Sequence, residues 1–222
     1  MKINEIDILA IGAHPDDVEV GCGGFLAKAK KEGLKTGIIV LTKGGAGKDG
    51  NTEIRSCESR NASKILGVDY FKMYDFEDSR IECNNDNAEI IALDIVALKP
   101  GIILTLYGDD YHSDHVEVSR LVKKAVFQSV LKRISNGKYC GPKQLLYFPL
   151  NFKKIINPDL VVDISDVYEI KKQALSAHQS QKNVLNDLDK IYNAYAALCD
   201  SEYVEVFKSE YPLKINNIKS LL

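Results

Sequence analysis

All four histidines of the chain stand in segments that also carry acids or other polar groups suited to hydrolysis. His14 lies in residues 13–17 (AHPDD), His112 and His115 delimit residues 112–115 (HSDH), and His178 precedes Gln179-Ser180-Gln181. Histidine is the commonest metal-binding side chain, and its proton moves near neutral pH. The grouping of so few histidines with acids therefore predicts a metal centre with acid–base chemistry.

The first segment supplies two metal ligands, and the second supplies a third. His14 and Asp17 are three residues apart, so both can face one point where a turn enters a helix. A catalytic zinc site has three protein ligands and an open position, so two are too few, and His115 is the simplest addition. We predict Zn²⁺ by default, and mixed nitrogen and oxygen ligands also accept another divalent ion such as Fe²⁺.

The remaining polar groups of these segments predict a hydrolytic mechanism. Asp16 is adjacent to the ligands but points in another direction, so it is free to act as general base toward a metal-activated water. Protonated His112 is placed to stabilise an oxyanion or to protonate a leaving amine. Asp114 is then expected to fix the tautomer of His112, as outer carboxylates do.

Buried strands precede both segments, as the chemistry requires. Residues 8–12 and 102–107 are apolar runs, and ligands of open α/β sheets bind beyond the carboxyl ends of such strands. Alternating strand and helix patterns predict an α/β fold with a Rossmann-like, mostly parallel sheet, helices on both faces and a C-terminal extension of the sheet. The expected strands are 8–12, 36–42, 69–74, 102–107, 144–148, 160–164 and 203–207, and the expected helices are 17–31, 53–66, 85–98, 114–131, 167–177 and 186–198.

Composition narrows the class of protein further. The 222 residues suit a single domain over 1–222, and a net charge of -2 offers no basic surface for nucleic acid. Five scattered cysteines without a CxxC pair are typical of reduced thiols. Neither a signal peptide nor a membrane span is expected, so the predicted location is the cytoplasm.

Other interpretations of the same residues stay open. An Asp at a helix start, taken alone, is more often a helix cap than a ligand. The Gly-rich residues 43–50 lack the spacing of a phosphate-binding loop and predict a substrate-side lid or a flexible loop. Residues 21–24 (GCGG) are expected to pack the first helix closely on the sheet. Two other classes of protein remain possible interpretations: a nucleotide-binding protein on the same fold, and a protein that keeps these residues but has lost catalytic activity.

The two histidine–aspartate segments, with residues 52–58, 158–165 and 174–181, resemble the PIG-L/LmbE-like zinc-dependent N-deacetylases over most of the chain. Within that family the motifs are most similar to those of the bacillithiol-pathway N-acetylglucosaminyl malate deacetylases. The resemblance implies metal binding by His14, Asp17 and His115, general base catalysis by Asp16, and oxyanion stabilisation by His112. It also implies a homo-oligomer, a trimer or hexamer.

Substrate-binding residues follow from the same resemblance. It implies that Arg55 and Tyr111 contact the substrate and that His178 lines the pocket rim or supports the site. Tyr111 stands where many relatives carry arginine, which weakens the case for an acidic aglycone. N-acetylglucosaminyl malate nevertheless stays the predicted substrate, because the motifs resemble those deacetylases and Arg55 offers a planar fork for a carboxylate. A chito-oligosaccharide or a natural-product intermediate is the alternative.

Overall fold

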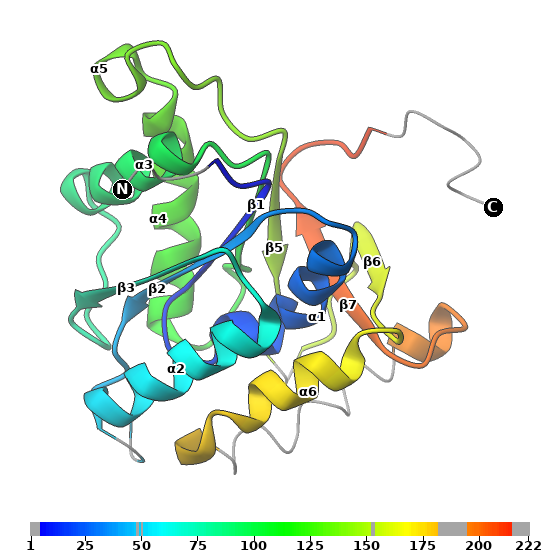
Figure 1. The fold of residues 1–222 in the computed structure, drawn as a ribbon. Coiled ribbons are helices and arrows are strands. Elements are labelled where there is room, and N and C mark those ends of the chain that lie inside the picture. The colour runs from blue at the N-terminus through cyan, green and yellow to red at the C-terminus, as the bar shows by residue number, and fades with distance from the viewer. Residues whose placement is uncertain (1–4, 48, 50, 152–153, 182–194, 215–222) are drawn as a thin grey trace.

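Seven strands form one central sheet in the computed structural model, which describes residues 5–47, 49, 51–151, 154–181 and 195–214 (Figure 1). The strands are β1 (Ile8–Gly12), β2 (Thr36–Thr42), β3 (Tyr70–Phe76), β4 (Ile102–Leu106), β5 (Gln144–Phe148), β6 (Leu160–Asp163) and β7 (Val204–Ser209). The helices are α1 (Asp17–Lys31), α2 (Thr52–Leu66), α3 (Asn85–Leu98), α4 (Ser113–Ser129), α5 (Lys132–Ser135), α6 (Tyr168–Ser176) and the short 3-10 helix η1 (Gln179–Gln181).

The order of the strands confirms the predicted Rossmann-like sheet. It runs β3-β2-β1-β4-β5-β7-β6, and the first five strands pair in parallel. β7 is antiparallel to both β5 and β6 and extends the sheet, as expected for the C-terminal section. The chain order reverses between the adjacent strands β1 and β4, which creates the crevice where ligands of such sheets bind.

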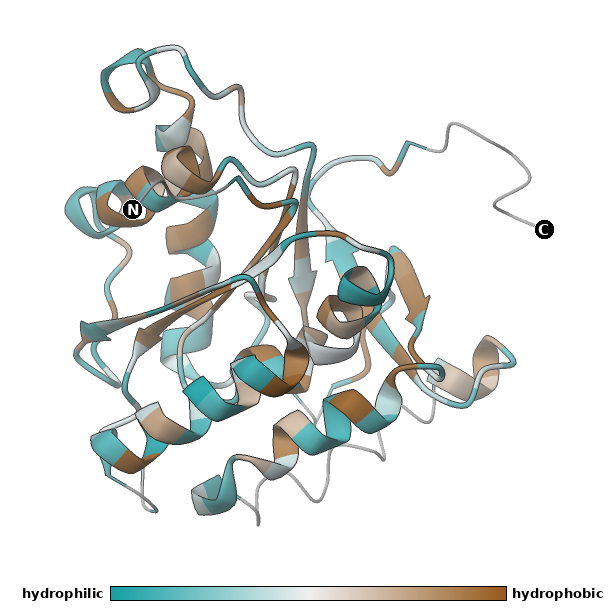
Figure 2. Cartoon of the chain, viewed as in Figure 1, coloured by the Kyte–Doolittle hydropathy of each residue, from teal (hydrophilic) through white to brown (hydrophobic). Residues whose placement is uncertain are grey.

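Helices cover both faces of the sheet. α1, α2 and α6 pack together on one face, and α3, α4 and α5 pack together on the other (Figure 1). The apolar residues gather on the strands and on the sides of the helices that face them (Figure 2). β1 and β2 are buried along their whole length, as strands covered on both faces must be. Within the described ranges, no helix is long and apolar enough to cross a membrane.

Most predicted elements lie within two or three residues of the observed ones, and the differences occur at their ends. Asn51, not Thr52, caps α2, because its side chain accepts a hydrogen bond from the amide of Ile54. The helix predicted from Asn186 to Leu198 falls mostly outside the described residues, and its described part, 195–198, is helical.

The first helix differs from the prediction in one respect that matters below. α1 is not continuous, because Cys22 has non-helical angles (φ -149°, ψ 19°) that divide it into two segments. Gly21 and Gly24 flank this break and allow the close packing expected of residues 21–24. A Cβ at Gly21 would lie 2.0 Å from the ring of Phe148, and one at Gly24 would lie 2.6 Å from Ile164.

Candidate active site

The two predicted segments meet at the crevice between β1 and β4. His14 and Asp17 follow β1 directly, and His112 and His115 lie at the start of α4, after β4. The ring centroids of His14 and His112 are 4.7 Å apart, and those of His14 and His115 are 5.5 Å apart. The parallel pairing of β1 with β4 therefore brings together residues about a hundred positions apart in the sequence.

His14, Asp17 and His115 form a buried group in which each residue offers one ligand atom. Nδ1 of His14 lies 3.5 Å from Oδ2 of Asp17, and Nε2 of His115 lies 3.3 Å from Oδ1 of Asp17. The Asp17 carboxylate is held in place because Oδ2 also accepts the backbone N–H groups of Ala13 and His14, at 2.9 and 2.8 Å. The structure thus assembles the three residues that the sequence predicts as ligands.

The outer nitrogens of both histidines contact carboxylates. Nε2 of His14 lies 3.1 Å from Asp114 and 3.2 Å from Asp78, and Nδ1 of His115 lies 2.9 Å from Asp110. Such carboxylates orient metal-binding histidines and raise their basicity. Asp78 and Asp110 were missed by the sequence analysis, although both follow strands whose carboxyl ends face the crevice.

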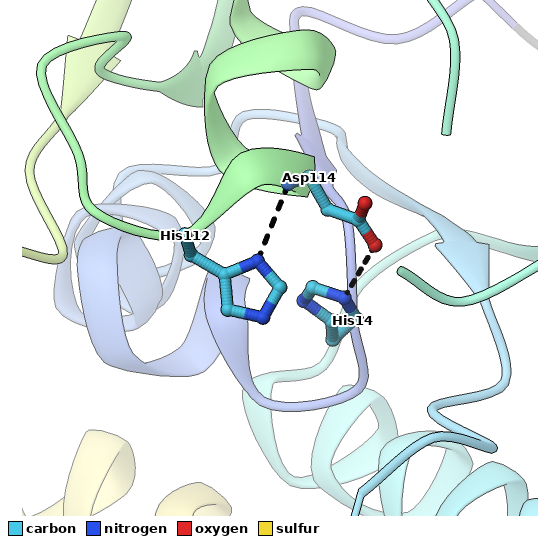
Figure 3. A group of neighbouring side chains, drawn as sticks. All are labelled: His14, His112 and Asp114. Atoms are coloured by element: carbon cyan, nitrogen blue, oxygen red, sulfur yellow. Dashed lines mark hydrogen bonds and ion pairs between the residues drawn. The ribbon is translucent and has the colours of Figure 1, made fainter. Parts of the chain in front are cut away.

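A divalent metal ion fits this donor set. The three ligand atoms lie within 4.8 Å of one another, and two imidazoles with one carboxylate are the ligands of catalytic zinc sites. A second group, formed by His14, His112 and Asp114, is equally compact. Its atoms are engaged with each other, because Asp114 contacts Nε2 of His14 and its amide donates to Nδ1 of His112 (Figure 3). His14, Asp17 and His115 all line the pocket, whereas Asp114 does not, so the first group is the better candidate metal site.

The two neighbouring carboxyls Asp16 and Asp17 have opposite electrostatic environments. Burial and the adjacent Asp17 raise the pKa of Asp16 to about 6. Burial also acts to raise the pKa of Asp17, but His115 and His14 outweigh it and hold that pKa well below its usual value. Paired acids with divergent pKa values are typical of a base beside a permanently charged group. This arrangement supports Asp16 as base and Asp17 as ligand.

Asp16 also has an unusual backbone conformation. Its φ of 101° lies in the left-handed region, which costs a non-glycine residue about 1–3 kcal/mol. Arg55 secures this turn from α2, because its guanidinium donates to the carbonyl oxygen of Pro15 at 3.0 Å and lies 3.6 Å from the Asp16 carboxylate. The surrounding contacts therefore hold Asp16 in a strained position, as is common at functional sites.

Arg55 is engaged with the protein itself, although it also lines the pocket. Besides Pro15, it donates to the carbonyl oxygen of Gly44 at 3.0 Å, and its side chain is 6% exposed. Gly44 has φ +69°, and a Cβ there would lie 2.2 Å from the guanidinium. The role predicted for Arg55, direct substrate contact, is thus joined by a second one that links the Gly-rich loop to the Asp16 turn.

His112 lines the pocket, and its Nδ1 atom already accepts a hydrogen bond from the protein. It is the N-cap residue of α4, and its Nδ1 accepts the amide N–H of Asp114 at 3.3 Å. Burial, followed by the neighbouring His115 and His14, lowers the pKa of His112. Because Nδ1 accepts this amide, Nε2 is the ring nitrogen that can hold a proton toward the pocket. The protonated ring expected from the sequence stays a prediction. The Asp114 backbone fixes this tautomer, while its carboxylate contacts His14 (Figure 3).

The pocket has a volume of about 310 Å³ and is lined by both polar and apolar side chains. Tyr111, 69% exposed, stands at its mouth, and Leu150, Gln181 and Ala46 add to the wall. Ala46 is fixed by its amide, which donates to Asp78 at 2.9 Å. Ala46 and Gly47 of the Gly-rich loop therefore form part of the pocket wall. Whether the loop acts as the predicted lid or as a flexible loop stays a prediction.

His178 is not at the pocket rim, and that part of the sequence prediction needs correction. Its side chain is fully buried behind the site, where Nε2 lies 3.4 Å from Oε1 of Glu19. α6 ends two residues before His178, and the chain there packs inward against α1 and α2. Direct contact with substrate is excluded by this burial, so His178 can act only through its neighbours.

Comparison with known proteins gives a result consistent with this geometry. Residues 9–126 match the PIG-L family, described as GlcNAc-PI de-N-acetylase. The "Uncharacterized deacetylase YaiS" of Escherichia coli is 38% identical over 117 residues, which are 50% of this chain and 63% of that protein. The chain thus matches slightly less than two thirds of that relative's length.

Two further relatives align over most of the chain. The diacetylchitobiose deacetylase of Thermococcus kodakarensis is 30% identical over 81% of this chain and 73% of that protein. A probable N-acetyl-alpha-D-glucosaminyl L-malate deacetylase 2 of Bacillus subtilis is 28% identical over 82% of this chain and 87% of that protein. Among solved structures, the conserved protein TT1542 of Thermus thermophilus has a TM-score of 0.88 at 31% identity, covering 95% of this chain and 97% of that one.

The fold and the site define an α/β protein with a buried histidine–aspartate centre beyond the carboxyl ends of its parallel strands. The chain belongs to the PIG-L family, and the class of enzyme that this family represents is the N-deacetylase.

Proposed function

We propose that this protein is a metal-dependent hydrolase that removes the acetyl group from an N-acetylglucosamine-type conjugate. The observation that carries the proposal is the pairing of a compact His14–Asp17–His115 ligand group with an adjacent carboxyl, Asp16, whose pKa is raised to about 6. Asp16 lines the pocket beside this ligand group without belonging to it, so its carboxylate is free to take a proton from water. Family membership supports the same reaction.

The metal would be held by His14, Asp17 and His115. When bound, a divalent ion supplies Lewis acidity, which polarises a carbonyl group and makes a water molecule more acidic. Zinc is the default because of the ligand types, and Fe²⁺ suits the same donors.

The remaining residues of the chain account for proton transfer and charge stabilisation. Asp16 accepts the proton of the attacking water as the water oxygen forms its bond to the acetamide carbon. His112 donates a hydrogen bond from Nε2 to the carbonyl oxygen, which becomes negatively charged as the tetrahedral carbon forms. The amine then leaves with a proton returned from Asp16, and acetate remains. Arg55 keeps Asp16 in position throughout, through the carbonyl of Pro15.

For the conjugate itself, N-acetylglucosaminyl malate is the first candidate. It rests on the resemblance of the motifs and on the Bacillus subtilis relative, whose name specifies this substrate. Tyr111 offers a ring and a hydroxyl at the pocket mouth, and Arg55 lines the pocket wall.

A neutral conjugate such as a chito-oligosaccharide is the second candidate, and two observations favour it. The Arg55 guanidinium donates to two carbonyl oxygens, lies beside Asp16 and is only 6% exposed, so it presents little surface to a malate carboxylate. The groove next to the pocket is also rich in acids, since Asp75, Glu77 and Asp78 all line it. The Thermococcus kodakarensis relative is named for diacetylchitobiose.

An acetate-release assay on the metal-loaded protein separates the candidates. The panel contains N-acetylglucosaminyl malate, diacetylchitobiose and a neutral N-acetylglucosamine glycoside. A tenfold higher kcat/KM for one of them, about 1.4 kcal/mol in transition-state binding, assigns the conjugate. Absence of acetate release from every member would contradict the proposal as a whole.

A further inference from the structure

The division of α1 at Cys22 leaves backbone groups that an unbroken helix would pair internally. In a regular helix the N–H of Gly24 donates to the carbonyl oxygen of Val20, four residues earlier. Here the N–H of Gly24 donates to Oε1 of Glu205 at 2.8 Å, and that of Phe25 donates to Oε2 at 2.6 Å. The carbonyl oxygen of Val20 instead accepts from Nζ of Lys171 at 2.8 Å.

Lys171 and Glu205 also pair with each other. Nζ of Lys171 lies 2.6 Å from Oε1 of Glu205, and their side chains are 6% and 0% exposed. The pair therefore lies between the two halves of α1: Glu205 caps the start of the second half, and Lys171 caps the end of the first. Both residues come from the C-terminal section, Lys171 from α6 and Glu205 from β7.

The first half of α1 is the part that serves the site. Asp17 begins it, and Val20, whose carbonyl Lys171 holds, lines the pocket. This half is only about a turn long, so its own hydrogen bonds cannot fix its direction. Phe148 and Ile164 pack closely against Gly21 and Gly24 at the break, where a Cβ would clash. The polar groups on both sides of the break are bound by the ion pair.

We propose that Lys171 and Glu205 are positioning residues for the metal centre. By holding the two ends of the break in α1, they fix the direction of residues 17–21 and with it the reach of the Asp17 carboxylate toward His115. Neither touches the reacting atoms. A buried ion pair often adds little to stability compared with apolar residues, so a positional role explains its presence better than a stabilising one.

The double variant Lys171→Met/Glu205→Gln tests this proposal, because it leaves no buried charge without a partner. The zinc dissociation constant, measured by chelator competition, is expected to rise at least tenfold. In the metal-free protein, amide hydrogen exchange of residues 17–21 is expected to accelerate at least tenfold, while that of β2 stays the same. Circular dichroism verifies that the variant is folded at the assay temperature.

Tyr139→Phe is the matched control. It removes another buried hydrogen bond, from the Tyr139 hydroxyl to the carbonyl of Pro100 at 2.8 Å, at the end of β4 opposite the site. Its zinc dissociation constant is expected to stay within twofold of the parent value. If the folded double variant also stays within twofold and its exchange is unchanged, the pair is merely structural and the proposal is overturned.

Glu205→Asp provides the decision if the double variant does not fold. It keeps the charge but withdraws the carboxylate by one methylene group, so the two amides and Lys171 cannot all be reached. A rise of at least threefold in the zinc dissociation constant supports the proposal, and no change overturns it. The relevance of this inference to catalysis rests on the proposed function. Zinc affinity and hydrogen exchange are measured without substrate, so their outcome is independent of the deacetylase assay.

Discussion

The carboxylate of Asp114 lies 3.1 Å from Nε2 of His14, a contact between residues 100 positions apart that joins the two histidine–aspartate segments. It leaves Nδ1 of His14 directed at Asp17, 3.5 Å away. Asp110 has the same relationship to His115, whose other nitrogen also faces Asp17. The proposed metal site is thus bordered by carboxylates that contact the far nitrogens of its two histidines.

Removal of these outer carboxylates is predicted to weaken metal binding without abolishing it. Asp110→Asn and Asp114→Asn should each raise the zinc dissociation constant by about 10–100-fold, because the histidines lose their fixed orientation and part of their basicity. Asp109→Asn is the matched control, since this neighbouring acid contacts Lys154 at the surface. Equal affinities for all three variants in chelator competition would show that the outer contacts are unimportant.

Loss of the ligands themselves should have a larger effect. His14→Ala and His115→Ala each remove one of the three donors, and we expect neither protein to retain stoichiometric metal after dialysis. Elemental analysis measures this directly. If both variants keep one metal per chain, the ligand assignment is wrong.

Asp16→Asn separates the base from the ligands. The variant is predicted to keep its metal and to lose about 10²–10⁴-fold in kcat, because an amide cannot accept the proton of water. Asp17→Asn, by contrast, should lose both the metal and the activity. Turnover of Asp16→Asn within tenfold of the parent rate, with metal content equal, would assign the base elsewhere.

The contact between Gly44 and Arg55 predicts a difference between two glycine substitutions with the same backbone penalty. Gly44 and Gly67 have φ values of 69° and 70°, so alanine costs either position about 1–2 kcal/mol. The Cβ at Gly67 meets nothing within 4 Å, whereas that at Gly44 displaces the guanidinium that holds the Asp16 turn.

Gly44→Ala should therefore reduce kcat at least tenfold, and Gly67→Ala should leave it within twofold at a temperature where both are folded. Thermal denaturation checks that their stabilities are similar. Equal kcat values would mean that the loop can move away from Arg55 at no cost to catalysis.

The free energy of unfolding should depend on pH through Asp69, a residue in the turn between α2 and β3. Partial burial acts to raise the pKa of Asp69, but Lys30 and the amide of Thr36 outweigh it and hold this pKa below its usual value. The charged form is thus favoured in the folded state. Asp69 therefore stabilises the fold fully at a pH above its pKa in the unfolded chain, about 3.9. This stabilisation is lost as the pH falls through the lower pKa that Asp69 has in the folded protein.

Asp69→Asn should accordingly lower the free energy of unfolding by about 0.5–1 kcal/mol at pH 7, the usual size for an exposed pair. The difference from the parent protein should shrink at pH 3. Urea titrations at the two pH values measure it, and a difference that stays constant would refute the electrostatic origin.

The sheet and the meeting of His14, Asp17 and His115 could be predicted from the sequence because both depend on local signals. Apolar runs mark β1 and β4, and the short spacing of His14 and Asp17 is retained by the turn that connects β1 to α1. Alternation of strands and helices then implies that the ends of parallel strands meet. Neither prediction required knowledge of a contact between distant residues.

Contacts between segments that are distant in the sequence could not be predicted in the same way. His178 carries the signals of a site residue, but its burial depends on how the chain after α6 packs against Glu19. Asp78 reaches His14 only because β3 ends beside the Gly-rich loop, and the carboxylate of Asp114 turns to His14 instead of His112. The break in α1 is filled by residues from β7 and α6, which no pattern within the helix reveals.

Acetate release from N-acetylglucosamine conjugates, measured before and after metal removal, tests the central claim most directly. The metal-loaded protein is predicted to release acetate, to lose at least a hundredfold in rate after treatment with chelator, and to recover when Zn²⁺ or Fe²⁺ is restored to one ion per chain. A rate that is unaffected by complete metal removal, or a fully loaded protein that releases no acetate from any of these conjugates, would contradict it.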